Sequence, residues 1–351
     1  MTVYVGVDLH SNNNYVGIVN DANGVLFKKK LPNDLGTVLS VLEPFRKDLA
    51  GVAVESTFSW YWFVDGLMEN GYKVYLANPA AIQQYEGLKN IDDERSALWL
   101  ANLLRLGILP TGYIYPKEER PVRDLLRKRL HLVRHRSSHI LSIKNILSRN
   151  LGLRMRGHEV KKLTEKELKK LFPDEHLFLA VNASVTIMHE LTSQIDQIEN
   201  AVLARAKLKK EFHGLLSLPG IGDILALTIM LEAGDMKRFP EAGDYSSYCR
   251  CVRSTRTSNG KAKGEGNRKN GNRYLSWAYV EAANIAKRHY PLINRYYQKK
   301  MAQTNMVVAI KAISNKLARA SYYVLRDRVT YDERKLFGGK AEPVKGLARN
   351  P

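Results

Sequence analysis

Apolar residues in the first 110 positions form short runs that alternate with longer stretches in which they recur at helical spacing. The stretch Val3–His10 is rich in β-branched residues, which is typical of a buried strand. A second strand is predicted at residues 15–19, after a polar loop, and the two strands are expected to form a hairpin. Further strands are predicted at 25–31, 51–55 and 73–77, with helices at 34–47 and 60–70.

This order is three antiparallel strands followed by helix, strand, helix and strand, as in ribonuclease-H-like folds. We therefore expect residues 1–115 to form an α/β domain of the RNase H class. Beyond Pro110 the strand signals end, and the rest of the chain is expected to be mainly helical.

Two carboxylates end predicted buried strands of this domain. Asp8 closes the first apolar run, and Glu55 follows Val52, Ala53 and Val54. An acid at the end of an apolar strand is costly to bury unless it is paired or holds a cation. Two such strands side by side would bring both carboxylates to one edge of the sheet, which predicts a divalent-metal site.

Three further acids, Asp92, Asp93 and Glu94, precede a predicted helix. Acids in a first helical turn also stabilise the helix through its dipole, and that explanation stays open for each of them. The pairing with Asp8 and Glu55 favours Asp93 as a third metal ligand, with Asp92 as a further candidate.

Long helices are predicted over residues 120–150 and 175–209, joined by a polar, lysine-rich connector. The second helix has apolar residues at alternating three- and four-residue steps, so 116–210 is expected to be a basic, coiled-coil region. Few acids offset the charge of the first helix, which favours phosphate contacts. The candidates are Arg123, Arg127, Arg134 and Arg136.

A Pro-Gly-x-Gly turn at residues 219–222 lies between two predicted helices, which is typical of a helix-hairpin-helix. Its glycines, Gly220 and Gly222, would let backbone amides approach a phosphate. The turn opens a third region, 211–330, that is expected to be helical apart from one basic segment. A frayed tail is expected at 331–351.

The basic segment, residues 250–273, is nearly free of apolar residues, and a flexible loop that binds a polyanion explains its composition. Four hydroxyl groups lie within it, at Ser254, Thr255, Thr257 and Ser258. Cationic surroundings would suit a nucleophile that attacks phosphate, because they stabilise charge on the transferring group. The cations of the segment are Arg250, Arg253, Arg256, Lys261, Lys263, Arg268, Lys269 and Arg273.

The net charge of +20 favours a polyanionic partner. No apolar run approaches the roughly 20 residues that span a bilayer, and the N-terminus lacks a signal-type pattern, so we expect a cytoplasmic protein that acts on nucleic acid rather than at a membrane. The two cysteines, Cys249 and Cys251, lie too close together for an easy disulfide and have no neighbours that would complete a zinc site.

On these residues the chain resembles the DEDD transposases of bacterial insertion sequences that are guided by a bridge RNA, relatives of the Piv-type DNA invertases. Asp8 in Gly-Val-Asp and Glu55 in Val-Glu-Ser-Thr fit the first two acids of that family, and Asp93 fits the third. Ser96 stands where the family has its fourth acid. The family's Ser-Gly nucleophile motif lines up with Ser258, with the glycine displaced by one position.

The resemblance implies a RuvC-like domain, a coiled-coil insert and a transposase domain, acting together as a DNA recombinase that excises and inserts its own element. The RuvC-like acids would bind Mg²⁺ or Mn²⁺, and Ser258 would attack the scissile phosphate to leave a phosphoserine bond to DNA. It also implies a structured bridge RNA that pairs with donor and target DNA. The protein would form homodimers that assemble into tetramers.

Other interpretations stay open. A RuvC-like nuclease, in which water attacks at a metal site, would account for the acids but not for the basic serine segment. A catalytically silent relative that binds RNA and DNA is compatible with Ser96 in place of an acid. A sugar-kinase-like site around Asp8 is less favoured, because no glycine-rich phosphate loop follows it.

Overall fold

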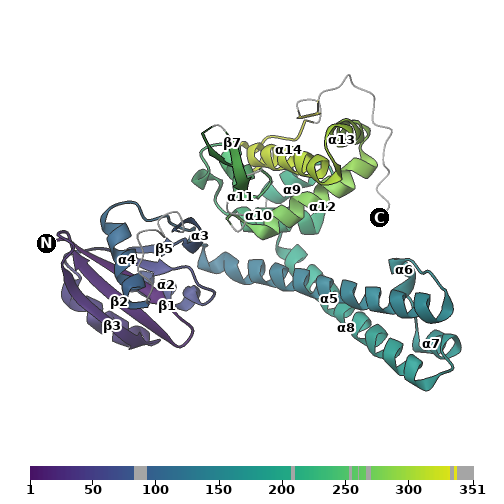
Figure 1. Ribbon diagram of the computed structural model, residues 1–351, viewed down its shortest axis with the longest axis horizontal. Coiled ribbons are helices and arrows are strands. Elements are labelled where there is room, and N and C mark those ends of the chain that lie inside the picture. Colours follow the sequence, from purple (N-terminus) through teal and green to yellow (C-terminus); the bar gives the residue numbers. More distant parts are fainter. Residues whose placement is uncertain are drawn as a thin grey trace. The chain divides into compact units, whose positions relative to one another are not determined.

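The computed structural model describes residues 1–82, 93–206, 210–252, 255–259, 261–265, 270–332 and 336–337 of the chain (Figure 1). The chain divides into two compact units, Met1–Lys117 and Glu118–Pro351. The first is a mixed α/β unit, and the second is built mainly of helices.

A five-stranded sheet forms the N-terminal unit, with the strand order β3-β2-β1-β4-β5. The first three strands are antiparallel, whereas β4 and β5 run parallel to β1. All five predicted strands are present, and the helix predicted at 34–47 is divided into α1 and a 3₁₀ turn at Pro44. The elements are β1 (Val3–Leu9), β2 (Asn13–Asn20), β3 (Val25–Pro32), α1 (Leu35–Leu42), η1 (Glu43–Phe45), β4 (Leu49–Glu55), α2 (Trp60–Glu69), β5 (Val74–Ala77), α3 (Pro79–Ile82) and α4 (Asp93–Arg105).

Alternate residues of β1 and β4 pack against different helices, which shows that the sheet is covered on both faces. Val5 and Val7 share a core with Val54 and with residues of α1 and α2. The intervening Ala53 belongs to a separate cluster with Leu100 of α4. Because side chains of a strand alternate between faces, even-numbered residues of β1 and odd-numbered residues of β4 face α4.

Helix α4 lies directly on the backbone of β1. A Cβ atom at Gly6 would overlap the carbonyl oxygen of Ala97 and lie 2.5 Å from the amide nitrogen of Ala101. At the other end of the helix, Arg105 donates to the carbonyl oxygen of Asp21, which lies beside the start of β1. Helix α4 therefore runs antiparallel to β1, and its N-terminus lies toward the end of the strand that carries Asp8.

The second unit begins with two 32-residue helices, α5 and α8, that pack against each other as a hairpin. The connector between them is not simply polar, because it forms two short helices with a core of their own. Val160 and Leu168 pack against Ile143 of α5 and Val181 of α8. The lysines between these apolar residues hid the helical spacing. The elements are η3 (Lys117–Glu119), α5 (Arg120–Leu151), α6 (Gly157–Val160), α7 (Glu165–Leu171) and α8 (Glu175–Ala206).

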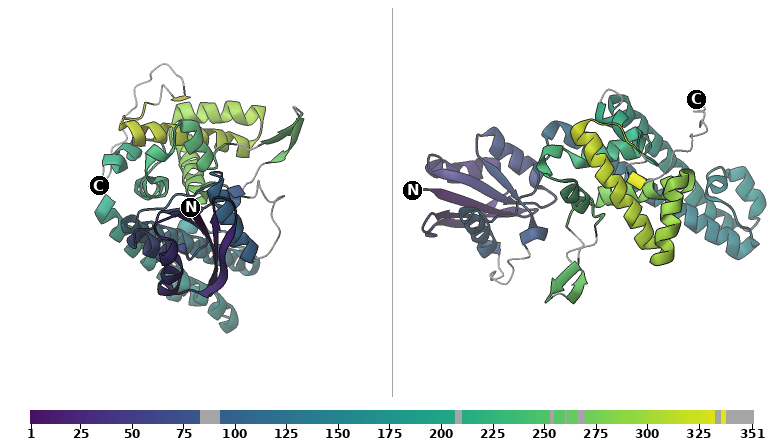
Figure 2. Two further views of the ribbon diagram at one scale, coloured as in Figure 1. Left: turned by 90° about the vertical axis from the view of Figure 1, so that its left-hand side faces the viewer. Right: turned by 90° about the horizontal axis from the view of Figure 1, so that it is seen from above.

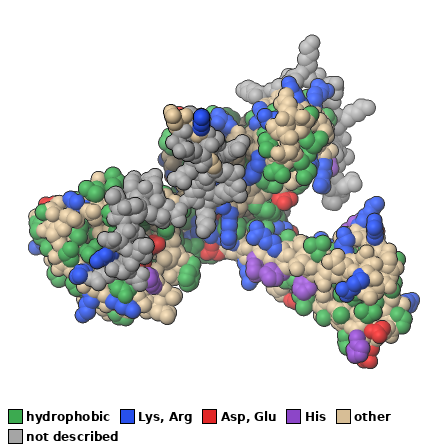
Figure 3. All heavy atoms as spheres, viewed as in Figure 1, with side chains coloured by type: hydrophobic (Ala, Val, Ile, Leu, Met, Phe, Trp, Pro, Cys, Tyr) green, Lys and Arg blue, Asp and Glu red, His purple; other side chains and the backbone are tan. Residues whose placement is uncertain are grey.

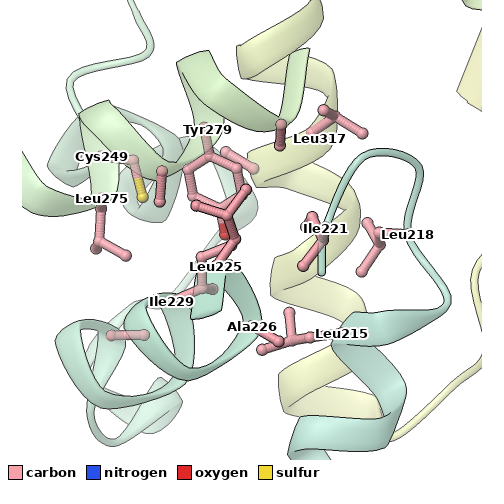
Figure 4. Packing of buried hydrophobic residues seen from close by; sticks show 14 of the residues in the cluster. Leu215, Leu218, Ile221, Leu225, Ala226, Ile229, Cys249, Leu275, Tyr279 and Leu317 are labelled. Atoms are coloured by element: carbon pink, nitrogen blue, oxygen red, sulfur yellow. The ribbon is translucent and has the colours of Figure 1, made fainter. Parts of the chain in front are cut away.

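Helix α10 is buried on nearly all sides, and α9, α12, α5 and α8 pack against it. The apolar side chains of this region form one core, to which Leu218, Ile221, Tyr279 and Leu317 belong (Figure 4). Ile221 lies in the Pro-Gly-x-Gly turn, and Leu218 directly precedes it. Cys251 lies in this core, and burial raises the pKa of its thiol to about 12. The elements are α9 (Lys210–Leu216), α10 (Asp223–Ala233), η4 (Met236–Arg238), α11 (Ala242–Tyr248), α12 (Arg273–His289), α13 (Pro291–Gln303) and α14 (Met306–Asp327).

The basic segment, expected to be a loop, contains a two-stranded hairpin of β6 (Thr255–Ser258) and β7 (Lys261–Glu265) (Figure 2). Ser258 pairs with Lys261, so two residues, Asn259 and Gly260, separate the strands, and Asn259 has a left-handed φ of 52°. An Asn-Gly pair between strands is a strong hairpin signal. The basic composition of the segment concealed this signal.

Candidate metal site and nucleic-acid interface

Asp8 and Glu55 lie at the C-terminal ends of adjacent parallel strands. The last paired residues of β1 and β4 are Val7 and Val54, so each acid is the next residue of its strand. Both acids are on the face of the sheet that α4 covers, by the alternation described above. Asp8 is buried and Glu55 is half-buried. Charged oxygens with little access to water are the ligands that Mg²⁺ or Mn²⁺ prefers, so these two residues fit a divalent cation.

His10 is a site residue that the sequence did not single out. Its Nε2 atom lies 3.2 Å from Oδ1 of Asp8. Asn33 holds the loop that carries His10, because its Nδ2 donates to the His10 carbonyl oxygen at 2.9 Å and its Oδ1 accepts from Asn14 at 3.1 Å. The spacing could have indicated His10, because side chains two positions apart along a strand lie on the same face of the sheet and His10 is two positions after Asp8.

The third candidate acid begins helix α4. Asp93 is the first residue of the helix, at the end that lies toward Asp8. The structure describes the backbone of Asp93 but not its side chain, and Asp92 lies outside the described residues. Ser96 is one turn further along α4 and is buried. Among the described side chains, no three His, Cys, Asp or Glu residues come together as a metal site. Two carboxylates, those of Asp8 and Glu55, therefore lie at this edge of the sheet. Asp93 is the first residue of the helix whose N-terminus lies toward the same edge.

Three of the four candidate arginines on α5 are buried or bonded within the protein. Arg123 is buried, and Arg127 forms a two-pronged ion pair with Glu232 of α10, whose side chain is only 3% exposed. Nε of Arg127 donates to Oε1 of Glu232 at 2.5 Å, and Nη2 donates to Oε2 at 2.8 Å. Arg136 donates to Thr192 of α8 at 3.3 Å. Arg127 is therefore paired with a carboxylate of the protein itself, in the absence of nucleic acid.

Exposed basic residues in the first half of α5 form a separate surface, which we call the outer face. It consists of Lys128, His131, Arg134 and His135. Figure 3 shows Lys and Arg side chains and histidines gathered along this helix. Partial desolvation and the nearby His135, Lys128 and Arg134 lower the pKa of His131, so His131 is neutral at pH 7 and adds positive charge only in acid.

The hairpin segment divides into described and undescribed parts. Ser258 is the last residue of β6, immediately before the turn. The structure does not describe the side chains of Ser258, Arg256 and Lys263. Lys261 and Arg273 are exposed. Arg250 is half-buried, and its Nε donates to the carbonyl oxygens of Asn270 and Gly271. Arg253, Arg268 and Lys269 lie outside the described residues.

The two glycines of the Pro-Gly-x-Gly turn have different surroundings. Gly220 has a left-handed φ of 74° and packs against the backbone of α12 at Ala282, which leaves no space for a side chain. Gly222 is the exposed N-cap of α10, with no atom within 4 Å of the position of a Cβ. Only Gly222 therefore presents open backbone to a phosphate, and Asp223 adds a negative charge beside it.

Comparison with known proteins identifies the class of both halves. A DEDD-type IS110 model described as "Transposase" matches residues 5–150, and a model described as "Transposase IS116/IS110/IS902 family" matches residues 213–298. The mini-circle putative transposase for IS117 of Streptomyces coelicolor is 24% identical, over 96% of this chain and 97% of the relative. The transposase for insertion sequence element IS1111A of Coxiella burnetii is 25% identical, over 78% of this chain and 76% of the relative.

The family models and the relatives define a DNA transposase. The chain belongs to the IS110/IS116 family of insertion-sequence transposases. Membership in the DEDD class implies use of a divalent metal ion, and transposition implies DNA as a partner. Within the described ranges, no helix is both long and apolar enough to cross a membrane.

The arginines of α5 make a direct prediction. Arg127→Gln should lower the free energy of unfolding by about 3 kcal/mol, because it leaves the buried Glu232 without its cation. Arg134→Gln, on the outer face of the same helix, should leave stability unchanged. It should instead reduce the slope of log K against log salt for nucleic-acid binding by about 1. Urea denaturation and salt titrations of both variants would measure these effects; equal stability of the two would contradict the assignment.

Proposed function

We propose that this transposase is an RNA-guided DNA recombinase that works through a covalent phosphoserine intermediate. Its N-terminal unit would be RuvC-like, of the RNase H class, and would supply the metal site. The observation that carries the proposal is the arrangement of Asp8 and Glu55 at neighbouring strand ends, beneath the helix that Asp93 begins. Ser258, the last residue of β6 in the basic hairpin, supplies the nucleophile.

In this proposal Asp8, Glu55 and Asp93 hold Mg²⁺ or Mn²⁺, with Asp92 as a further candidate ligand. A bound divalent cation supplies charge stabilisation to the oxygens of a scissile phosphate. Asp8 is kept in place by strand β1 and by its contact with His10, and Glu55 by its position at the end of β4. Burial of Asp8 keeps water from screening its charge, which favours cation binding.

Ser258 would carry out the strand transfer. Its Oγ forms a bond to phosphorus while the bond to the leaving deoxyribose oxygen breaks; the serine proton is lost and the leaving oxygen gains one. The phosphodiester energy is conserved in the phosphoserine bond, so a second DNA end can reverse the step and join. A hydrolytic nuclease would lose this energy to water.

Guide RNA and target DNA would both be bound electrostatically. The net charge of +20, the outer face of α5 and the exposed Lys261 and Arg273 supply cations for two polyanions. Base pairing by a structured bridge RNA would read donor and target sequences, while the protein contacts the backbones. The acids and Ser258 belong to different units of the chain, which is compatible with active sites shared between protomers of a dimer or tetramer.

Replacement of the proposed nucleophile is the first test. Ser258→Ala should abolish the covalent protein–DNA adduct and strand exchange, while DNA and RNA binding stay within a factor of about two, because the change removes no charge. Gel analysis of denatured reaction mixtures would detect the adduct. A normal adduct with this variant would move the nucleophile to Ser254, Thr255 or Thr257, and cleavage with no adduct in the unaltered protein would favour the nuclease alternative.

Ser96 allows a second test, directed at the metal site. Ser96 lies one helical turn from Asp93 on α4, so an acid there would face the same side as Asp93. Ser96→Asp should lower the Mg²⁺ concentration needed for half-maximal adduct formation, by about tenfold if one charged ligand is added. Ser40→Asp, at an exposed position of α1, is the matched control for charge and should change nothing.

An unchanged Mg²⁺ requirement in Ser96→Asp would mean that this turn does not face the metal. Asp92 and Glu94 would then be the next positions to alter. Complete inactivity of the natural chain, restored by Ser96→Asp, would favour the catalytically silent alternative.

A further inference from the structure

The two segments that flank the β6–β7 hairpin, one after α11 and one before α12, are hydrogen-bonded to each other. The amide of Asn272 donates to the carbonyl oxygen of Tyr248 at 2.6 Å, and Nε of Arg250 donates to the carbonyls of Asn270 and Gly271 at 3.0 and 3.1 Å. We call these five residues the hairpin base.

The hairpin base is closely packed as well as hydrogen-bonded. Gly271 has a φ of 84°, and a Cβ there would lie 2.5 Å from the Tyr248 carbonyl oxygen. Nζ of Lys311, in α14, donates to the carbonyl oxygen of Arg250 at 3.0 Å and to Ser276 of α12 at 3.1 Å. Movement of the base would therefore break its bond with Lys311 of α14.

Glu232 is a buried charge that contacts this base. It lies in the last turn of α10, where both the loss of water and the helix dipole disfavour a negative charge. Two donors compensate for this cost: Arg127 from α5, and Nδ2 of Asn272, which lies 2.7 Å from Oε2 of Glu232. One carboxylate thus binds α5 and the hairpin base at the same time.

Asn272 has a separate role as the N-cap of α12. Its Oδ1 accepts from the amides of Tyr274 and Leu275 at 2.8 and 3.1 Å, while its Nδ2 makes the bond to Glu232. A serine can replace the first function, because its hydroxyl is also a good N-cap, but it has no group that matches the second. The cap and the link to Glu232 can therefore be separated by mutation.

The chain of contacts continues to the surface. The Arg127 guanidinium lies 4.6 Å from the ring centre of Tyr274, and that of the exposed Arg273 lies 5.1 Å from the same ring. Arg127 is also the neighbour of Lys128 on the outer face of α5. Cations that can meet a nucleic acid are thus one residue away from the buried network.

We propose that Glu232 is a positioning residue for strand transfer: it fixes the hairpin base relative to α5, so that nucleic acid bound along α5 and the hairpin nucleophile keep a constant spacing. This inference rests on the proposed function for the identity of the nucleophile. The tether itself is defined by Arg127, Glu232 and Asn272, and can be tested without the chemistry.

The test compares Asn272→Ser with Asn305→Ser in the full-length protein. Asn305 is the N-cap of α14 and accepts from the amide of Val308 at 3.0 Å. Within the described part of the chain it makes no hydrogen bond to the hairpin base, so it controls for capping alone. Hydrogen exchange of peptides covering residues 255–265 should be about tenfold faster in Asn272→Ser and unchanged in Asn305→Ser, as expected for loss of one buried hydrogen bond.

Adduct formation supplies the second measurement. At saturating DNA, Asn272→Ser should form the adduct about tenfold more slowly or worse, with an unchanged DNA concentration at half saturation, because positioning rather than binding is lost. Glu232→Gln retains an oxygen that accepts from Asn272, so its hairpin exchange should stay closer to that of the unaltered protein. That partial rescue would not occur if Glu232 served only to neutralise Arg127.

Unchanged hairpin exchange and an unchanged adduct rate in Asn272→Ser would overturn the inference, as would a rate loss matched by Asn305→Ser. A failure of the proposed function gives a different result. If Ser258→Ala still forms the adduct, the nucleophile is wrong, whereas the exchange comparison still decides whether Glu232 holds the hairpin base.

Discussion

The contact between α4 and β1 is the constraint on which the candidate metal site depends. Position 6 has no side chain, so the backbone of α4 reaches the backbone of β1. The even-numbered face of β1 carries Gly6 and Asp8 in succession, and the helix that packs on the first must pass close to the second. A larger residue at position 6 would lift α4 from the sheet and carry its acidic N-terminus away from Asp8 and Glu55.

The basic residues of the second unit fall into two groups: buried ones that pair within the protein, and exposed ones that are available to nucleic acid. Arg123 and Arg127 of α5 point into the protein, where Glu232 compensates for the charge of Arg127, while Lys128 and Arg134 of the same helix face outward. Net charge alone therefore overstates the surface available to nucleic acid. The buried ion pair also explains how a basic helix can pack against the apolar α10 at all, since an unpaired arginine there would be strongly destabilising.

Sequence patterns predicted those helices and strands whose apolar residues recur at a regular spacing. The strand β1 and the 32-residue α5 are long and strongly periodic, and both were predicted within a residue or two of their observed ends. The two acids that end β1 and β4 were also recognised, because a carboxylate after a run of valines is unusual. What pairs with each acid depends on sheet register and helix placement, and His10 was missed for that reason.

Other errors had local physical causes. In the connector, lysines interrupt the apolar residues Val160 and Leu168, so a short helix looked like polar chain. In the basic segment, charge hid the Asn259-Gly260 turn. The ion pair between Arg127 and Glu232 was not anticipated, because the two residues lie 105 positions apart in the sequence. Long-range partners of this kind are fixed by the tertiary fold and leave no pattern in the neighbouring residues.

The most direct measurement of the central claim is to map the residue that becomes bonded to DNA. The protein would be incubated with DNA and Mn²⁺, the DNA trimmed by nuclease, and the peptides analysed by mass spectrometry. We expect a nucleotide attached through its phosphate to Ser258. This modification should be lost when Asp8 is changed to Asn, because the metal site and the serine act in one reaction. Modification of a different residue, or an undiminished Ser258 adduct in Asp8→Asn, would contradict this account.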